Sequence, residues 1–384
     1  MRFLLNILFV CSFFSACSQS YKNAEKQIIF INPSSVINNN DPEVKMVLST
    51  WEKYLQTKDS LYEYNPYWSS IEYKNKKYPD LFYKDINHST LFNIKNYYKP
   101  TVLSVEKVDS SYIIKTLFAS GEKDNGFNRV SAILNIEAIK ENNEWRLKSM
   151  EDRILKSLYK QYNSKEITYY YHKDHVLDTL LCSKFNIENN KLAHIFQTNT
   201  INVKYFLCKK NKEIQKIKGF DFANSMGYPN QISGLAEPLN NIIYAGNDSE
   251  WYLHELVHLY VYKLYGSNVN NCINEGIATY YGGSLGNTLE YHLHKVALYV
   301  KNNPVDFSNL SKLERIDDET NFQYTIGGLL CKTIDTKLGF NGIKKLLALK
   351  GDSDELLWSI IQELLNIKNS NFNDFIHNEL NKYN

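Results

Sequence analysis

The residues best suited to chemistry in this sequence lie in the stretch H-E-L-V-H, from His254 to His258. On a helix, positions i and i+4 share one face with Cβ atoms roughly 5–6 Å apart, so both imidazoles can face one point. Zinc binds neutral imidazole nitrogens at about 2.0–2.1 Å, which makes that point a candidate zinc site. Glu255, beside the first histidine, is placed to handle the proton of a zinc-activated water. The spacing therefore predicts a metal centre with an adjacent base.

A catalytic zinc site needs a third protein ligand and one open position. The segment N-E-G-I-A-T-Y-Y-G-G, residues 274–283, offers Glu275 as that ligand. We expect Glu275 to begin a second helix that ends at Gly282 and Gly283, because paired glycines are typical of helix ends. The candidate metal set is then His254, His258 and Glu275.

The flanks of the histidine stretch predict where its helix begins and ends. Asn247 is a favourable N-cap residue, and Glu250, three positions later, can complete a capping box. Gly266 suits the positive-φ position that ends a helix. We therefore expect one helix from about Asn247 to Gly266.

H-E-L-V-H followed sixteen positions later by N-E-G-I-A-T-Y-Y resembles the gluzincin metallopeptidases. The resemblance is to the branch that holds the alanyl-type aminopeptidases and the smaller bacterial peptidase MA-like proteins. It implies a thermolysin-like domain with a mixed sheet lobe and a helical C-terminal lobe. It also implies that His254, His258 and Glu275 bind one Zn²⁺, that Glu255 is the general base, and that the substrate is a peptide or protein.

Two further segments bear on this resemblance. Y-T-I-G-G, beginning at Tyr324, is similar to the family's Y-x-x-G-A, whose tyrosine hydroxyl faces the oxyanion. A tyrosine that merely packs is the alternative. The G-A-M-E-N segment of the aminopeptidases has no good match, because residues 234–238 (G-L-A-E-P) lie too near the histidine stretch. An endopeptidase, or a peptidase of unknown specificity, is therefore favoured over an aminopeptidase.

The N-terminal residues are typical of an export signal. Met1 and Arg2 precede a mainly apolar run over residues 3–14, which is too short to span a bilayer. Ser-Ala-Cys then ends at Cys17 and resembles the lipobox of bacterial lipoproteins, which implies lipidation of Cys17 and an envelope location. An ordinary cleaved signal is the alternative. We expect residues 1–16 to be the signal peptide.

The remaining chain is longer than one core usually serves, so two domains are expected. Residues 17–40 are polar and form a predicted tether. Residues 41–158 combine a helix, opened by Asp41, with an antiparallel meander, and resemble the nuclear-transport-factor-like (SnoaL-like) domains. Residues 151–163 look like a connector, and residues 159–384 are the gluzincin-like part. The predicted fold class is α+β.

The secondary structure expected from apolar periodicity supports this division. Strands are expected at residues 101–108, 111–119, 130–139, 144–150, 167–171, 201–207 and 241–245. Helices are expected at residues 174–185, 191–197, 212–218, 288–300, 322–338, 342–349, 355–365 and 372–383. A turn containing Gly234 and Pro238 is expected before the last strand.

The net charge and the cysteine content limit which partners and which disulfide bonds the sequence supports. The net charge is +2 and no basic block occurs, so nothing favours a nucleic-acid partner. Four cysteines remain after Cys17, and they allow three disulfide pairings among which the sequence does not choose. These cysteines are Cys182, Cys208, Cys272 and Cys331.

Two rival functions remain open. One is a non-enzymatic binding lipoprotein that uses a metallopeptidase-like scaffold to capture a peptide or polymer. The other is a structural zinc site, which would need a fourth protein ligand such as Cys272.

Overall fold

The structure is a computed structural model that describes residues 31–383, except 39, 59–62, 84–97, 121–129 and 369. The predicted signal peptide, Cys17 and most of the predicted tether lie outside the described residues. The chain divides into two compact units, residues 1–72 with 80–148 and residues 73–79 with 149–384. Both contain helices and sheets, so the α+β class is confirmed.

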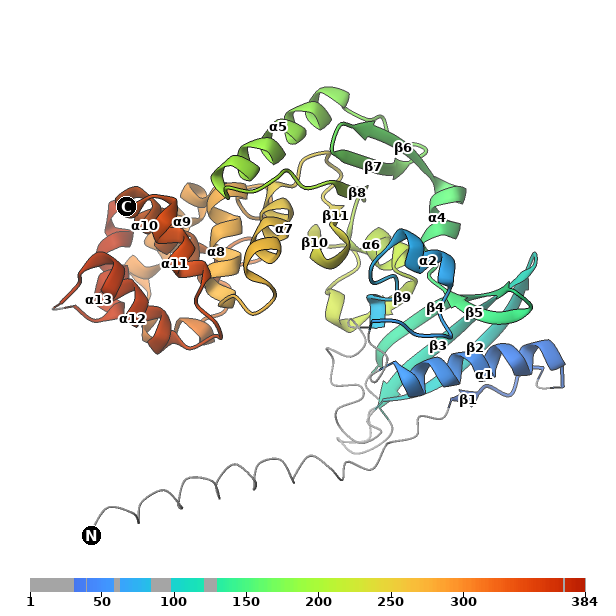
Figure 1. Ribbon diagram of the computed structural model, residues 1–384. Helices are drawn as coiled ribbons and strands as arrows, with labels where there is room; N and C mark the ends of the chain where they lie inside the picture. The colour runs from blue at the N-terminus through green and yellow to red at the C-terminus, as the bar shows by residue number, and fades with distance from the viewer. Residues whose placement is uncertain are drawn as a thin grey trace, which may run out of the picture. The chain divides into compact units, whose positions relative to one another are not determined.

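The first unit pairs one long helix with an antiparallel meander (Figure 1). Asp41 caps helix α1 (Pro42–Thr57) by accepting from the backbone N–H of Glu43 and Val44, as expected. The Trp51 indole donates to Thr116 on the sheet, 3.1 Å away, and so joins helix to sheet. The strands follow in the order β1 (Asn32–Pro33), β2 (Tyr98–Val108), β3 (Ser111–Ser120), β4 (Val130–Glu141) and β5 (Glu144–Lys148). Helix α2 spans Ser70–Asn75.

The second unit begins with a five-stranded mixed sheet. Its strand order is β10 (Ser233–Glu237), β11 (Ile242–Gly246), β8 (Val203–Leu207), β7 (Ile167–His172) and β6 (Tyr159–Ser164). The three central strands are parallel, whereas β10 and β6 are antiparallel edge strands. The elements between them are α4 (Glu151–Leu158), α5 (Thr179–Ile195), α6 (Asn211–Ile217), β9 (Phe220–Ala223), and the short η1 (Asn224–Met226) and η2 (Pro238–Asn240).

Helices make up the rest of this unit, and α7 contacts both β10 and β11. They are α7 (Leu253–Tyr265), α8 (Asn271–Gly282), α9 (Leu289–Asn302), η3 (Phe307–Lys312), α10 (Phe322–Leu338), α11 (Phe340–Leu347), α12 (Asp354–Leu365), α13 (Phe372–Leu380) and η4 (Asn381–Tyr383). One buried apolar core runs from the sheet through these helices. Among the described residues, none of the helices has the length and apolar character needed to cross a bilayer.

Several elements differ from the sequence predictions. Helix α5 is continuous, although two helices were predicted, because Asn189 in the expected break is held by distant partners: it donates to the Ile201 carbonyl and accepts from the Tyr260 hydroxyl. Residues 151–163 are α4 and most of β6 rather than a connector. The expected turn near Gly234 is strand β10.

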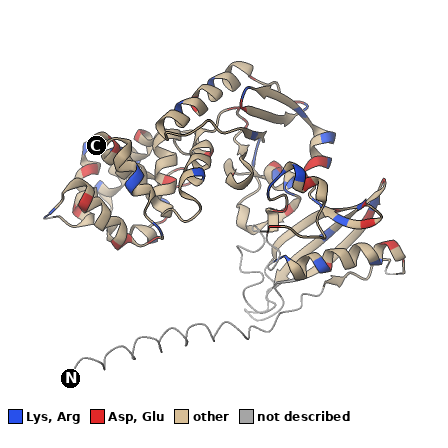
Figure 2. Ribbon diagram, viewed as in Figure 1, with Lys and Arg blue, Asp and Glu red and all other residues tan. Residues whose placement is uncertain are grey.

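Acidic and basic residues are interspersed along the described helices and strands (Figure 2), and the whole sequence has 44 Lys and Arg against 42 Asp and Glu.

Candidate metal centre

Helix α7 begins later than its sequence indicates. Its first residue is Leu253, and no side chain caps its N-terminus. The predicted capping box is wrong, because Glu250 is engaged elsewhere: its carboxylate accepts from His175 Nε2 at 2.9 Å and from the Asp178 backbone N–H at 2.8 Å. Asn247 instead accepts from the Ser249 backbone N–H. The loop before α7 is therefore fixed by contacts with the segment that leads into α5. The helix ends at Gly266, with φ of 75°, as predicted.

Helix α8 carries the third candidate ligand and packs closely on the start of α7. It begins at Asn271 rather than at Glu275, with Asn270 as its N-cap, and ends at Gly282 as predicted. A Cβ at Gly282 would lie 2.4 Å from the His254 backbone nitrogen, so only glycine permits this approach. The close contact brings Glu275 opposite the histidine face of α7.

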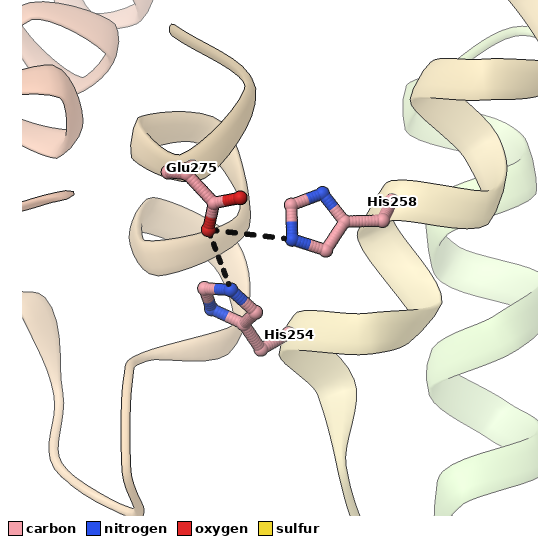
Figure 3. Close-up of side chains that lie close together, drawn as sticks. All are labelled: His254, His258 and Glu275. Carbon is pink, nitrogen blue, oxygen red and sulfur yellow. Dashed lines mark hydrogen bonds and ion pairs between the residues drawn. The ribbon is translucent and has the colours of Figure 1, made fainter. Parts of the chain in front are cut away.

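The structure brings His254, His258 and Glu275 together (Figure 3). Oε2 of Glu275 lies 3.3 Å from Nε2 of His254 and 3.5 Å from Nε2 of His258. One ligand atom from each residue lies within 4.8 Å of the other two. In the described part of the chain, this is the one group of three or more His, Cys, Asp or Glu that can hold a metal ion.

The Nδ1 nitrogen of each imidazole already has a hydrogen-bond partner. His254 Nδ1 lies 2.7 Å from the Gly283 carbonyl oxygen, and His258 Nδ1 lies 3.2 Å from Oδ1 of Asn274. Both partners are acceptors, so each Nδ1 carries a proton and each neutral ring keeps its lone pair on Nε2. The lone pairs of the two Nε2 atoms then face a carboxylate oxygen of Glu275. These three electron-rich atoms repel one another unless a cation lies among them.

The spacing fits a tetrahedral metal ion. With metal–ligand distances of about 2.0–2.1 Å, neighbouring ligand atoms of a tetrahedron lie about 3.3–3.4 Å apart. The two distances to Glu275, 3.3 and 3.5 Å, lie close to this value. Two imidazoles and one carboxylate are also a donor set that zinc accepts, with one position left open. The residues present therefore fit the ion that the sequence predicts.

The close approach of the two imidazoles to Glu275 also shifts the pKa values of His258 and Glu275. Burial alone would lower the pKa of His258, but the carboxylates of Glu275 and Glu255 and the Asn274 amide raise it to about 9. Burial would raise the pKa of Glu275, yet the two imidazoles hold it well below its usual range. Without a metal ion, a proton on the imidazoles thus supplies the positive charge that the cluster requires.

Glu255 is buried beside the cluster and is not one of the residues in the group that can hold a metal ion. Burial raises the pKa of its carboxyl, and the nearby imidazoles of His254 and His258 oppose that shift only in part. The Ala236 backbone N–H of β10 also lies close enough to lower the pKa. A desolvated carboxylate with a raised pKa is a stronger proton acceptor than an exposed one, as a general base requires.

Tyr324 lies in the first turn of α10, next to the cluster. Its ring is nearly parallel to that of His254, with 6.1 Å between ring centroids. Burial raises the pKa of its hydroxyl, and the Glu275 carboxylate raises it further, so the hydroxyl keeps its proton. Helix α10 can approach α8 closely because Gly276 of α8 faces Gly327 of α10. A Cβ at Gly276 would lie 2.3 Å from the backbone carbonyl carbon of Gly327.

Two neighbours of Glu275 take no direct part. The buried Thr279 hydroxyl has no hydrogen-bond partner, so it orients neither histidine. The Cys272 thiol donates to the Gln323 carbonyl at 3.4 Å and is not part of the metal-binding group. Cys182, Cys208, Cys272 and Cys331 are all buried and free.

Sequence reasoning missed the groups that orient the site. Asn274, which holds His258, was a recognisable candidate because it directly precedes Glu275 on the same helix. The Gly283 carbonyl and the Ala236 N–H are backbone groups, which no sequence pattern reveals. Glu237, in the segment G-L-A-E-P, pairs with Lys218 and Asn240 at 3.0 Å each, so its carboxylate is occupied away from the cluster.

Comparison with known proteins adds no family assignment. No protein-family model matches the sequence, and a search of curated proteins found no significant match. The function is therefore inferred from the motifs and from the geometry of the site.

Proposed function

We propose that this protein is a zinc-dependent peptidase of the gluzincin type. The observation that supports the proposal most strongly is the convergence of three acceptor atoms, from the buried His254 and the half-buried His258 and Glu275, at distances that suit a tetrahedral ion. Glu255 beside them supplies the second requirement, a buried carboxylate outside the ligand set.

In this proposal the zinc ligands are His254, His258 and Glu275. When bound, zinc supplies a Lewis acid that polarises the scissile carbonyl and acidifies the attacking water. Glu255 accepts the proton of that water on its carboxylate and later returns it to the leaving nitrogen. Tyr324 donates its hydroxyl hydrogen to the oxyanion that develops on the carbonyl oxygen.

The finer fold assignments belong to the same proposal. The second unit is proposed to have the thermolysin-like gluzincin fold, with β10 as the edge strand to which an extended peptide adds through its backbone. The first unit is proposed to be nuclear-transport-factor-like. Helix α1 and the antiparallel meander of β2 to β5 support that assignment.

We further propose that Cys17 carries lipid and attaches the protein to the cell envelope. The lipobox-like Ser-Ala-Cys sequence after a short apolar run supports this proposal. Labelling of intact cells with a fatty-acid analogue is expected to mark the wild-type protein. A Cys17→Ser variant that still becomes labelled would exclude this anchor.

The activity is tested on the full protein with a mixed peptide library, with and without a chelator, alongside Glu255→Gln. This substitution removes the proton carrier but no ligand, so zinc content is expected to stay normal. Turnover is expected to fall by about 10²–10⁴-fold. Zinc binding without any cleavage by the wild-type protein would favour the binding-lipoprotein alternative, and loss of zinc from Glu255→Gln would show that its role is wrongly assigned.

A further inference from the structure

The geometry points to strand β10 as the element that positions Glu255, and to Gly234 as the residue that makes room for its carboxylate. The catalytic meaning of this inference rests on the proposed peptidase function. The packing on which it depends can be tested without turnover.

The strand register explains why β10 faces the base. Gly234 pairs with Ala245 and Ala236 pairs with Ile243 in the antiparallel ladder between β10 and β11. In such a ladder, residues two apart direct their backbone groups to the same side. The Ala236 N–H lies beside the Glu255 carboxylate, so the backbone of Gly234 also faces away from β11 and toward α7.

The space at Gly234 is filled by the base itself. A Cβ at this position would lie 2.3 Å from Oε1 and 2.7 Å from Cγ of Glu255, and 2.4 Å from Cε1 of Tyr252. Contacts this short do not occur in folded proteins, so any side chain here must displace the carboxylate or the tyrosine ring. Gly234 is not among the described glycines with positive φ, so its backbone accepts alanine without strain. Space alone therefore requires glycine.

Gly234, Tyr252 and the Ala236 N–H together confine the Glu255 side chain next to the ligand cluster. Proton transfer depends on hydrogen-bond distance, and a displacement of about 1 Å can reduce a rate by roughly 10²-fold. Gly234 is thus a positioning residue that acts through Glu255, and none of the three atoms nearest to its added Cβ belongs to a candidate metal ligand.

The first test compares Gly234→Ala with Gly342→Ala in the zinc-loaded full chain. Gly342 on α11 is a matched control because a Cβ there would also be crowded, at 2.6 Å from Ile334 Cγ2 and 2.8 Å from Leu338 Cβ, both in the C-terminal half of α10 and not in β10. We expect Gly234→Ala to keep stoichiometric zinc and a KM within twofold of wild type, while kcat falls at least tenfold. Gly342→Ala is expected to keep kcat. A normal kcat in Gly234→Ala would overturn the proposal.

The second test uses metal-free protein and thermal unfolding. Gly234→Ala is measured in the wild-type and Glu255→Ala backgrounds, because removing the glutamate side chain relieves the clash with it. The loss of Tm caused by Gly234→Ala is expected to be at least about 3 °C smaller in the Glu255→Ala background, whereas the loss caused by Gly342→Ala is the same in both. Equal losses for Gly234→Ala in both backgrounds would overturn the proposal.

A folding failure is also informative. If Gly234→Ala does not fold but Gly234→Ala with Glu255→Ala does, the clash lies at the base, as proposed. If neither variant folds, the added methyl group clashes with atoms other than those of Glu255, and the proposal fails. If the wild-type protein cleaves no peptide, the proposed function fails, but the unfolding comparison still decides whether Gly234 positions Glu255.

Discussion

Each unit of this protein buries a polar cluster, and the two clusters are built on opposite principles. In the first unit, Lys58 forms an ion pair with Asp80, whose carboxylate also accepts from the Tyr54 hydroxyl at 2.8 Å. Donors there meet acceptors, and the opposite charges offset each other. In the second unit, His254 and His258 direct acceptor nitrogens at a carboxylate oxygen of Glu275.

The difference shows which cluster needs something from outside the chain. A buried ion pair is complete in itself, although it contributes little net stability because both charges lose their hydration. Three converging acceptors are incomplete, and a metal ion or a proton must complete them. Burial of polar groups does not by itself indicate a functional site. What indicates one is that the buried groups are all acceptors and converge on one point.

The largest expected effect comes from removing one acceptor of the incomplete cluster. His258→Ala is expected to lose bound zinc entirely, to reduce cleavage to background, and to abolish the rise in Tm that zinc gives the wild type. Metal analysis of the dialysed protein, with thermal unfolding, measures this. His294→Ala on α9, an exposed histidine bonded to the Tyr383 carbonyl, is the control and is expected to keep zinc. Full zinc occupancy in His258→Ala would contradict the assigned ligand set.

Breaking the complete cluster is expected to affect stability alone. Asp80→Ala removes the carboxylate of a buried ion pair with Lys58, and removing one partner of such a pair typically costs about 3–5 kcal/mol. Denaturant unfolding measures the loss, and zinc content is expected to stay at the wild-type level. A loss below about 1 kcal/mol would mean that the ion pair contributes no more than a surface pair.

A smaller effect is expected from Tyr324→Phe, which keeps the ring but removes the hydroxyl. A donor to the oxyanion acts mainly in the transition state, so kcat is expected to fall about 10²–10³-fold, or roughly 3–4 kcal/mol, with little change in KM. Zinc content and Tm are expected to stay normal. A kcat within threefold of wild type would identify Tyr324 as a packing residue.

The smallest effect is a graded pH dependence of the metal-free protein. The pKa of His258 is raised to about 9 from the usual histidine value of about 6.5, so its proton contributes stability that is fully present below about pH 6.5. That contribution is lost as pH rises through about 9, at no more than about 1.4 kcal/mol per pH unit. Denaturant unfolding between pH 6 and 10 measures it. In His258→Ala this dependence is expected to disappear, and its persistence there would assign it to another group.

Local sequence patterns predicted the elements that carry the site. Helix α10 was predicted with its observed bounds, and the ends of α7 and α8 were predicted from their glycines. The i, i+4 spacing placed both histidines on one face. What brings Glu275 to that face is the contact between Gly282 and His254, which is visible only in the folded chain.

The errors have two physical causes, which are competition from distant partners and the weak apolar pattern of edge strands. Glu250 was expected to cap α7, but His175 and the Asp178 N–H, some seventy residues earlier, bind its carboxylate. Strands β6 and β10 were missed because edge strands of polar or small residues lack the alternation that marks a half-buried strand. Strand β10, which lies beside Glu255, was one of the two.

X-ray absorption at the zinc edge tests the central claim most directly, using the purified protein loaded with one equivalent of zinc. We predict a first shell of nitrogen and oxygen alone, at about 2.0–2.1 Å, with imidazole scattering from two histidines. The same spectrum is expected from Glu255→Gln, which keeps every ligand. A sulfur contribution at about 2.3 Å would contradict this account, because it would bring a cysteine such as Cys272 into a closed structural site.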